Sequence, residues 1–368
     1  MKPQLPRYGE STLADLLPSL GAHLGLPGVQ DVLGLPDAPR YLVVLVDGLG
    51  RAVLDEYADH APFLSGLDGR TITSGVPSTT ATSITSLGTG LAPGAHGIAG
   101  YSFWYPPARQ VLQTLRWPAD IDGLDVQPQL TCFERLERLG VRTSTIAPAH
   151  FSGSGLTVAA LRGPAFLPVT DESDQARRVD LAVHAVTAGE RTLGYFYERQ
   201  LDHAGHERGV GSREWLRELA RIDVLVARLR EAVPAEVRLV VTGDHGMVNV
   251  PRSLRIVAED EPGLLADVTA FAGEGRLRQL MTGRAADVAQ RWRDRLADRA
   301  WVRTREEAIA EGWFGDVSPR LASRFGDVLV AMANHGAVMS RTLPREFQLV
   351  GMHGSLTRAE LEVPLLFA

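Results

Sequence analysis

Short apolar runs recur along the chain, and segments with a helical pattern separate them. Runs that are rich in β-branched residues are typical of strands covered on both faces, as in a largely parallel sheet. The clearest runs lie at residues 41–46, 141–146, 193–197, 237–241 and 363–367. We therefore expect these segments to be the strands of one buried sheet.

The clearest helical pattern lies between Ser212 and Pro234. Apolar residues recur there at spacings of three and four, at Leu216, Leu219, Ile222, Val226 and Leu229. Ser212 is a candidate N-cap, and Pro234 marks the end of the segment. Strands that alternate with helices indicate a layered α/β core. The predicted fold is a central, largely parallel sheet with helices on both faces.

The segment 251–341 has a different composition from the rest of the chain. It is rich in Arg, Asp, Glu and Ala, and it contains none of the candidate site residues described below. We interpret it as an inserted, smaller cap subdomain, and we assign residues 1–250 and 342–368 to the α/β catalytic core. The alternative is that this segment continues the core.

Side chains of the metal-binding type follow several of the predicted strands. Asp47 comes directly after the first apolar run, Asp244 and His245 follow the run at 237–241, and Asp202 follows the run at 193–197. In open α/β sheets, ligands bind beyond the carboxyl ends of the strands. A single Asp in such a position is often a cap or turn residue. The prediction of a metal site therefore rests on the occurrence of such side chains after three separate strands.

Two histidines extend this set. His206 lies four residues after Asp202, so on a helical turn both side chains share one face and can reach one ion. His353 lies in a glycine-rich loop near the C-terminus. The glycines that flank Asp244 and His245 are interpreted as a source of backbone freedom, which lets the two adjacent side chains diverge.

A hydroxyl completes the set. Thr80 lies in the Ser/Thr run that follows Pro77, and a helix is expected after it. A hydroxyl at such a junction faces the N–H groups of a helix N-terminus, which attract phosphate. Composition alone does not single out one nucleophile in this run. The alternative is that Ser78, Thr79 and Thr80 only cap the helix.

Three carboxylates, three imidazoles and one hydroxyl are a natural ligand set for two divalent ions with a nucleophile between them. This combination predicts phosphoryl-type chemistry on a two-metal site. Asp and His ligands without cysteine favour zinc, and manganese is the alternative.

Composition narrows the class of partner. The chain has 368 residues, 45% hydrophobic and 22% charged, and its formal net charge of −6 argues against a nucleic acid polymer or an anionic membrane as partner. We expect no membrane span and no signal peptide, because no apolar run is long enough. Cys132 is the only cysteine, and we expect it to be a buried, inert thiol on the apolar side of a helix. The expected location is the cytoplasm.

The candidate residues lie in motifs that resemble the alkaline phosphatase superfamily, and within it the type I phosphodiesterase/nucleotide pyrophosphatase family. The most specific stretches are PSTTATSITSLGTGLAPGAHGIAGY, DHAGH, TGDHGM and GMHG, in the order of the family and within residues 41–368. The resemblance implies an alkaline phosphatase-like fold and one zinc bound by Asp47, Thr80, Asp244 and His245. It implies a second zinc bound by Asp202, His206 and His353. It also selects Thr80 over Thr79 as the nucleophile, because of the spacing to Pro77 and to the later Thr-Gly.

The sequence departs from the nucleotide-specific members of that family just after the nucleophile. Those members carry Thr-Phe-Pro-Asn, whereas this chain carries Thr-Ala-Thr-Ser at residues 80–83. Ala81 cannot stack a base, and Ser83 is a shorter substitute for the Asn that binds a phosphate oxygen. An aromatic segment at residues 100–117 is a candidate for contact with the leaving group.

The resemblance implies a metal-dependent hydrolase that cleaves a small phosphodiester or pyrophosphate through a covalent phospho-threonine intermediate. A phosphomonoesterase or a phosphonate (C–P) hydrolase of the same superfamily is the alternative. A more remote alternative is an inactive homologue that binds metal or ligand. The expected partner is a small phosphate ester, with no nucleic acid polymer and no membrane.

Overall fold

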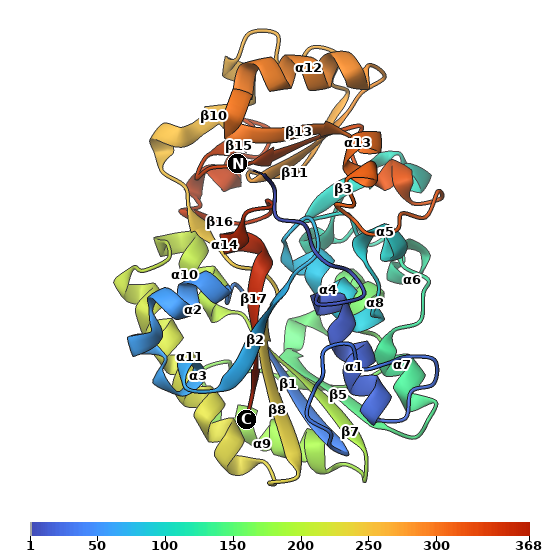
Figure 1. The fold of residues 1–368 in the computed structure, drawn as a ribbon, viewed down its shortest axis with the longest axis vertical. Helices are drawn as coiled ribbons and strands as arrows, with labels where there is room; N and C mark the ends of the chain where they lie inside the picture. Colours follow the sequence, from blue (N-terminus) through green and yellow to red (C-terminus); the bar gives the residue numbers. More distant parts are fainter. Residues whose placement is uncertain (1) are drawn as a thin grey trace.

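A seven-stranded sheet forms the centre of the larger part of the molecule (Figure 1), in a computed structural model that describes residues 2–368. The strand order is β2-β17-β8-β1-β7-β5-β6. The bounds are β1 Arg40–Val46, β2 Asp68–Thr73, β5 Arg142–Pro148, β6 Ala165–Val169, β7 Thr192–Glu198, β8 Val237–Gly243 and β17 Glu362–Phe367. The strands from β8 to β6 are parallel, and β17 runs antiparallel to both of its neighbours, β8 and β2.

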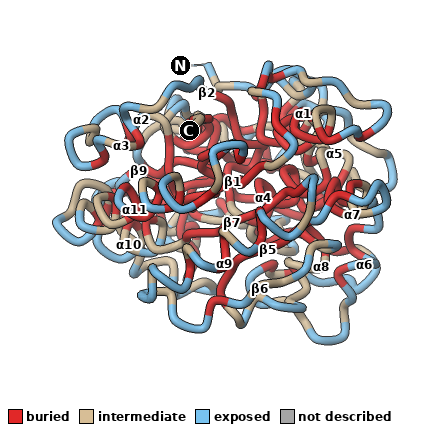
Figure 2. Tube along the Cα trace, turned by 90° about the horizontal axis from the view of Figure 1, so that it is seen from below, coloured by how far each residue is buried: buried red, intermediate tan, exposed pale blue. Residues whose placement is uncertain are grey.

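Helices cover both faces of this sheet, and the strands between them are buried (Figure 2). One face packs against α1 Leu16–His23, α4 Thr80–Thr89, α7 Cys132–Glu137 and α8 Gly155–Leu161, with the short helices α5 Pro93–His96 and α6 Gly123–Val126 beside them. The other face packs against α2 Arg51–Glu56, α3 Pro62–Ser65, α9 Gln175–Thr187, α10 Gln200–Arg208 and α11 Arg213–Ala232. The predicted fold class is confirmed.

The predicted strands and the predicted helix are also confirmed. Each of the apolar runs lies in a strand of the large sheet, and the amphipathic segment forms α11. Ser212 is the N-cap of α11, because its side chain accepts a hydrogen bond from the backbone N–H of Trp215. Cys132 lies buried at the start of α7, where burial raises the pKa of its thiol to about 12.

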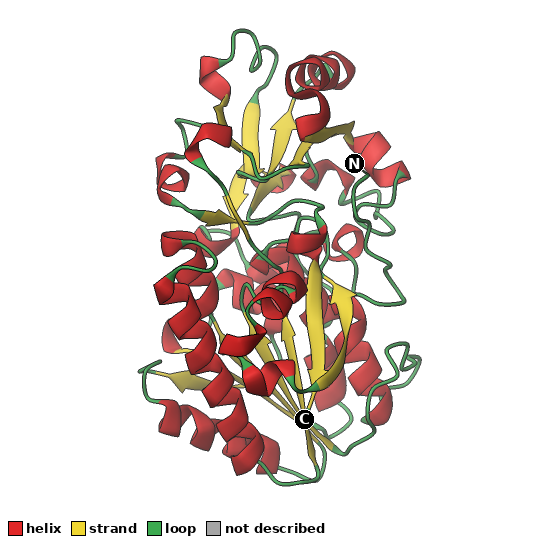
Figure 3. Ribbon diagram, turned by 60° about the vertical axis from the view of Figure 1, so that its left-hand side comes forward, coloured by secondary structure: helices red, strands yellow, loops and turns green. Residues whose placement is uncertain are grey.

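A second sheet lies at the other end of the molecule (Figure 3), with α12 Ala285–Leu296 packed on its outer side (Figure 1). It is antiparallel, in the order β11-β12-β14-β13. The bounds are β11 Ala270–Glu274, β12 Leu277–Met281, β13 Ala300–Thr304 and β14 Val328–Met332, and α13 Arg305–Ala310 follows β13. Residues of the segment 251–341 form this whole sheet, and the division into core and cap at 250 and 342 stays a prediction.

Short strand pairs form outside the two larger sheets. They are β3 Ser102–Tyr105 with β4 Gln110–Gln113, β9 Val248–Asn249 with β16 Gly351–Met352, and β10 Arg255–Val257 with β15 Ala337–Met339. The last helix, α14 Arg358–Leu361, leads into β17. Within residues 2–368, no helix has both the length and the apolar character that a membrane span requires.

Candidate metal centre

The candidate ligands meet at the carboxyl ends of β1, β7 and β8. Val46, the last residue of β1, lies opposite Glu198 of β7 and Gly243 of β8, so the three strands end side by side. Asp47 and Asp244 are the next residues after β1 and β8, and Asp202 lies in α10, which follows β7. This arrangement places all three carboxylates at one edge of the sheet.

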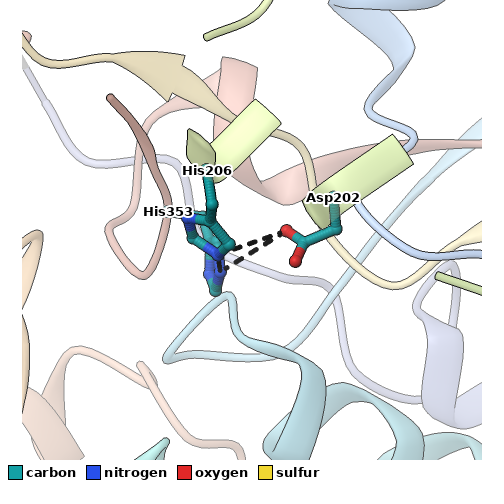
Figure 4. Close-up of side chains that lie close together, drawn as sticks. All are labelled: Asp202, His206 and His353. Atoms are coloured by element: carbon teal, nitrogen blue, oxygen red, sulfur yellow. Dashed lines mark hydrogen bonds and ion pairs between the residues drawn. The ribbon is translucent and has the colours of Figure 1, made fainter. Parts of the chain in front are cut away.

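Asp202, His206 and His353 form one group (Figure 4). Their nearest ligand atoms all lie within 4.8 Å of one another. The Nε2 atoms of His206 and His353 are 3.3 Å apart, and Asp202 Oδ1 lies 3.4 Å from the first and 3.9 Å from the second. Asp202 and His206 share one face of α10, as their spacing predicts.

Asp47, Asp244 and His245 form the second group, with ligand atoms again within 4.8 Å of one another. His245 Nε2 lies 3.5 Å from Asp47 Oδ1 and 3.6 Å from Asp244 Oδ2. Thr80 Oγ1 lies 3.2 Å from the same Nε2 atom. The two groups are adjacent, because the rings of His245 and His353 stack with centroids 3.6 Å apart. The structure thus brings all seven predicted residues together.

The three histidines share one tautomer. Nδ1 lies 2.8 Å from Gly351 O in His206, 3.0 Å from Gly246 O in His245 and 3.0 Å from Ser78 O in His353. A carbonyl oxygen only accepts hydrogen bonds, so each Nδ1 carries a proton, and in the neutral imidazole Nε2 is then the nitrogen that presents a lone pair. Two lone pairs that face each other at 3.3 Å repel unless a cation lies between them. Backbone carbonyls orient metal-binding histidines in this way.

Each of the three carboxylates keeps one buried oxygen without a hydrogen-bond partner: Asp47 Oδ1, Asp202 Oδ1 and Asp244 Oδ2. The other oxygens of Asp47 and Asp244 accept hydrogen bonds, from the Tyr197 hydroxyl and from the backbone N–H groups of Gly48 and His245. Burial raises the pKa of the Asp47 carboxyl well above its usual range, and the charges of Asp244 and Asp202 raise it further. A buried carboxylate is costly unless a cation balances it. The donor set therefore fits two divalent ions.

Thr80 is the first residue of α4, and Thr79 is its N-cap. Ser83 N–H donates to Thr79 O, so the N–H groups of residues 80–82 have no partner within the helix. Thr79 Oγ1 instead donates a hydrogen bond to Glu274 Oε2, at 3.4 Å. Of the two threonines, only Thr80 presents its hydroxyl to the metal-type ligands, which supports the choice of Thr80.

The glycines that flank Asp244 and His245 are not needed for backbone freedom, which was our interpretation from the sequence. Neither Gly243 nor Gly246 adopts a positive φ. A Cβ atom on Gly243 would lie 2.1 Å from Leu49 O, and one on Gly246 would lie 1.9 Å from Ala359 O. These glycines are needed because two backbone segments approach closely, and this approach holds the loop with Asp244 and His245 against the chain after β1.

A cavity of about 750 Å³ opens beside the two groups. Its lining includes Asp47, Thr80, Asp202, His206 and His353, together with residues from α4, α8, β5 and β7. Ser83 is fully buried and is not among the lining residues, so the structure does not place its hydroxyl beside a bound phosphate. His203 also lines the cavity, but its side chain is exposed and its Nε2 lies 3.4 Å from Glu207 Oε1.

Only the ends of the aromatic segment border the cavity, and their contact with a leaving group stays a prediction. Tyr101 and residues 114–117 line the cavity. Phe103 and Tyr105, in β3, are buried in the hydrophobic core instead. In the middle of the segment, β3 and β4 pair with each other and lie against β11 of the second sheet, which keeps Phe103 and Tyr105 out of the cavity.

Two residues at the metal centre, Tyr197 and Glu274, were not predicted from the sequence. Tyr197 donates its hydroxyl proton to Asp47 Oδ2, although the pattern indicated only a strand residue. Glu274, from β11, lines the cavity, with one oxygen 3.6 Å from His353 Nδ1 and the other buried without a hydrogen-bond partner. Burial raises the pKa of Glu274 well above its usual range. Nothing in the sequence of the segment 251–341 singles out this residue.

Comparisons with known proteins identify a family and a shared fold. The model of the type I phosphodiesterase/nucleotide pyrophosphatase family matches residues 41–356. No curated protein matches significantly. The murine ectonucleotide pyrophosphatase/phosphodiesterase 5 is similar in structure, with a TM-score of 0.71 and 17% identity over 89% of this chain and 87% of that chain.

Two further structures give nearly the same values. An inactive variant of the murine protein in complex with AMP has a TM-score of 0.71 and 16% identity, over 89% of this chain and 87% of that chain. The human protein has a TM-score of 0.71 and 17% identity over the same shares. At such low identity the likeness shows a common fold.

Proposed function

Since the chain belongs to the type I phosphodiesterase/nucleotide pyrophosphatase family, we propose that it cleaves a small phosphodiester or pyrophosphate through a covalent intermediate on Thr80. The chain is a hydrolase of the phosphodiesterase/nucleotide pyrophosphatase type, and the family is metal-dependent. One observation carries the finer proposal. Three imidazole lone pairs and three unpaired carboxylate oxygens converge beside the Thr80 hydroxyl.

Two divalent ions belong to this proposal. Asp47, Asp244 and His245, with Thr80, would hold one ion, and Asp202, His206 and His353 would hold the other. Bound there, two such ions lower the pKa of a coordinated hydroxyl and neutralise negative charge on a phosphoryl group. Zinc is our first choice because it suits a mixed nitrogen and oxygen set, and manganese is the alternative.

The chain's own groups then perform the reaction in two steps. Thr80 Oγ, having lost its proton to solvent, forms a bond to phosphorus, and the bond from phosphorus to the leaving oxygen breaks. The leaving group departs with the electron pair and takes up a proton. A water molecule then attacks the phosphorus of the phospho-threonine and loses a proton to solvent, while the bond from phosphorus to Thr80 Oγ breaks and Thr80 Oγ leaves with the electron pair and is protonated again. The free N–H groups at the start of α4 bind a phosphoryl oxygen during both steps.

The cavity sets the size of the substrate. A volume of about 750 Å³ suits a small organic ligand. The AMP bound by the inactive murine variant supports a substrate of nucleotide size, although Ala81 offers no ring on which a base could stack. A cytoplasmic location and the absence of a nucleic acid polymer or a membrane as partner stay predictions.

The test compares bis-p-nitrophenyl phosphate with p-nitrophenyl phosphate, each with and without a chelator. We expect a higher kcat/KM on the diester and loss of that turnover in the chelator. Preference for the monoester would instead support a phosphomonoesterase. No chelator-sensitive turnover of either ester, nor of a phosphonate, would contradict the proposal.

A further inference from the structure

Part of the cavity lies between the large sheet and the helices that cover it. On the sheet side it is lined by Thr145, Ala147, Phe166, Tyr195 and Tyr197, which lie on β5, β6 and β7. On the helix side it is lined by Ala81 and Ile84 of α4 and by Gly155, Leu156 and Leu161 of α8. We call this part the inner chamber. It begins beside Thr80, so a group attached to the reacting phosphorus can enter it.

Two hydroxyl groups of the inner chamber have no hydrogen-bond partner. Thr145 and Tyr195 lie opposite each other in neighbouring parallel strands, so both side chains lie on the same face of the sheet. Their exposed fractions are only 2% and 1%, and neither Thr145 Oγ1 nor the Tyr195 hydroxyl oxygen forms a hydrogen bond. Burial, reinforced by the charges of Asp244 and Asp47, raises the pKa of Tyr195, so its hydroxyl keeps its proton and can donate it.

An unpaired buried hydroxyl costs free energy, and a valine or a phenylalanine would fit either position in a sheet without that cost. Buried polar groups in folded proteins are almost always hydrogen-bonded. Two such groups in the same register, both lining a cavity that leads to the reaction centre, therefore point to a partner that the ligand supplies.

The rest of the inner chamber indicates the chemistry of that ligand. Ile84, Leu156, Leu161 and Phe166 line it with apolar surface. The charged cavity residues lie outside the inner chamber, and two of them, Arg116 and Arg345, are exposed. An apolar wall with two donors suits an uncharged, largely apolar group that carries one hydrogen-bond acceptor.

We propose that the inner chamber binds one ester group of the substrate, and that Thr145 and Tyr195 select a group with a hydrogen-bond acceptor on an otherwise apolar body. This proposal rests on the proposed function, because the group enters as a substituent of the phosphate held beside Thr80. Ala81 keeps the entrance open, since a large side chain at this position would fill the space between α4 and the sheet. Thr145 and Tyr195 are thus specificity-determining residues for the hydrolysis.

The test uses two flat bicyclic phosphate esters as binding probes for the metal-loaded protein. 4-Methylumbelliferyl phosphate carries a ring carbonyl as acceptor, and 2-naphthyl phosphate has a similar body without one. Calorimetry measures the Kd of each probe for the wild type, Thr145→Val and Tyr195→Phe. We expect each substitution to raise the Kd of the first probe by about three- to tenfold, as for the loss of one neutral hydrogen bond. The Kd of the second probe should change by no more than about twofold.

Thr143→Val is the matched control, because it makes the same change two residues earlier on β5. The Thr143 hydroxyl donates to Glu137 Oε1 at 2.7 Å and so has a structural partner. We expect this variant to lower the melting temperature and to leave both Kd values unchanged. In the absence of a probe, Thr145→Val and Tyr195→Phe should keep or raise the melting temperature, since each removes an unpaired buried hydroxyl.

An equal rise in the Kd of both probes, or an unchanged Kd of the first probe, would overturn the proposal. A wild-type protein that binds neither probe would overturn it as well, and so would a fall in melting temperature like that of Thr143→Val. These measurements need no turnover. Chelator-sensitive cleavage of bis(4-methylumbelliferyl) phosphate by the wild type separately shows whether the proposed function holds.

Discussion

Two buried polar clusters of this protein differ in how their charges are balanced. Between the two sheets, Arg276 donates two hydrogen bonds to Glu360, at 2.9 and 2.7 Å, and neither side chain is exposed. Arg276 also donates to backbone carbonyls, and Glu360 also accepts from Ser355 N–H and the Thr357 hydroxyl. In the metal centre, three carboxylates lie together without a lysine or an arginine paired to them.

This difference separates a structural cluster from a functional one. Where the chain supplies its own cation, every charge is paired and the cluster joins two parts of the fold. Where the chain supplies only carboxylates and lone pairs, the balancing charge must come from outside. The variants below test this distinction, and the largest expected effect comes first.

Replacing the proposed nucleophile should have the largest effect. We expect Thr80→Ala to lower kcat on a diester by about 10⁴-fold or more, because no other hydroxyl lies beside His245 to attack phosphorus. Metal content should stay the same, since the six Asp and His ligands remain. Thr79→Ala is the control and should keep most of the activity. If the two variants behave the other way round, the nucleophile is Thr79.

Breaking the balanced cluster should cost the most stability. Glu360→Gln keeps the shape of the side chain but leaves Arg276 as a buried, unpaired charge. We expect a loss of about 3–5 kcal/mol in the free energy of unfolding, measured with urea. The matched control is Glu362→Gln, whose partner Arg358 is exposed on the surface, and which should cost about 1 kcal/mol or less. Equal effects of the two variants would argue against the structural role of Arg276–Glu360.

A buried group can also avoid the need for balance by staying neutral. His96 accepts a hydrogen bond from Ile98 N–H and contacts the Ser86 hydroxyl. Burial, with the nearby charge of Arg324, lowers its pKa from 6.5 to about 3.

The folded state binds a proton at His96 more weakly than the unfolded state does. The contribution of His96 to the free energy of unfolding is therefore fully present above pH 6.5 and is lost as the pH decreases towards 3. We expect this residue to account for about 2 kcal/mol lost between pH 8 and pH 5. His96→Gln should be less stable at pH 8 but should have a flatter pH profile in urea unfolding. An unchanged profile would show that His96 does not titrate in this way.

Loss of a carboxylate should have opposite effects on stability in the two clusters, because in the metal-free protein the metal centre has no cation to balance its charges. The pKa of Asp47 is raised above its ordinary value of 3.8, so the metal-free protein loses stability as the pH rises above that value. We expect Asp47→Asn to raise the stability of the metal-free protein at pH 8 by about 1 kcal/mol. With metal added, the wild type should gain more stability than the variant. Destabilisation of the metal-free protein by Asp47→Asn would contradict this account.

Much of the sheet and most of the centre could be predicted from the sequence, for physical reasons. A buried parallel strand reads as a continuous apolar run, so Asp47 and Asp244 are visible as the first polar residues beyond two strand ends. The spacing of Asp202 and His206 places them on one helical face.

Residues that depend on contacts distant in the chain could not be predicted. Glu274 reaches the metal centre from the second sheet, and the local sequence pattern does not predict how that sheet packs against the large sheet and its helices. Phe103 and Tyr105 resemble cavity residues in composition, but pairing with β4 and contact with β11 bury them in the core. The unpaired hydroxyls of Thr145 and Tyr195 look like ordinary strand residues until the register of β5 and β7 is known.

The central claim is that two divalent ions balance the carboxylates of the metal centre. The most direct test is the zinc content of the protein after dialysis against zinc and then against metal-free buffer. We predict two ions per chain in the wild type and in Glu362→Gln, and a loss of ions when Asp47 and Asp202 are both replaced by Asn. Less than one ion per chain in the wild type, or an unchanged content in the double variant, would contradict the account.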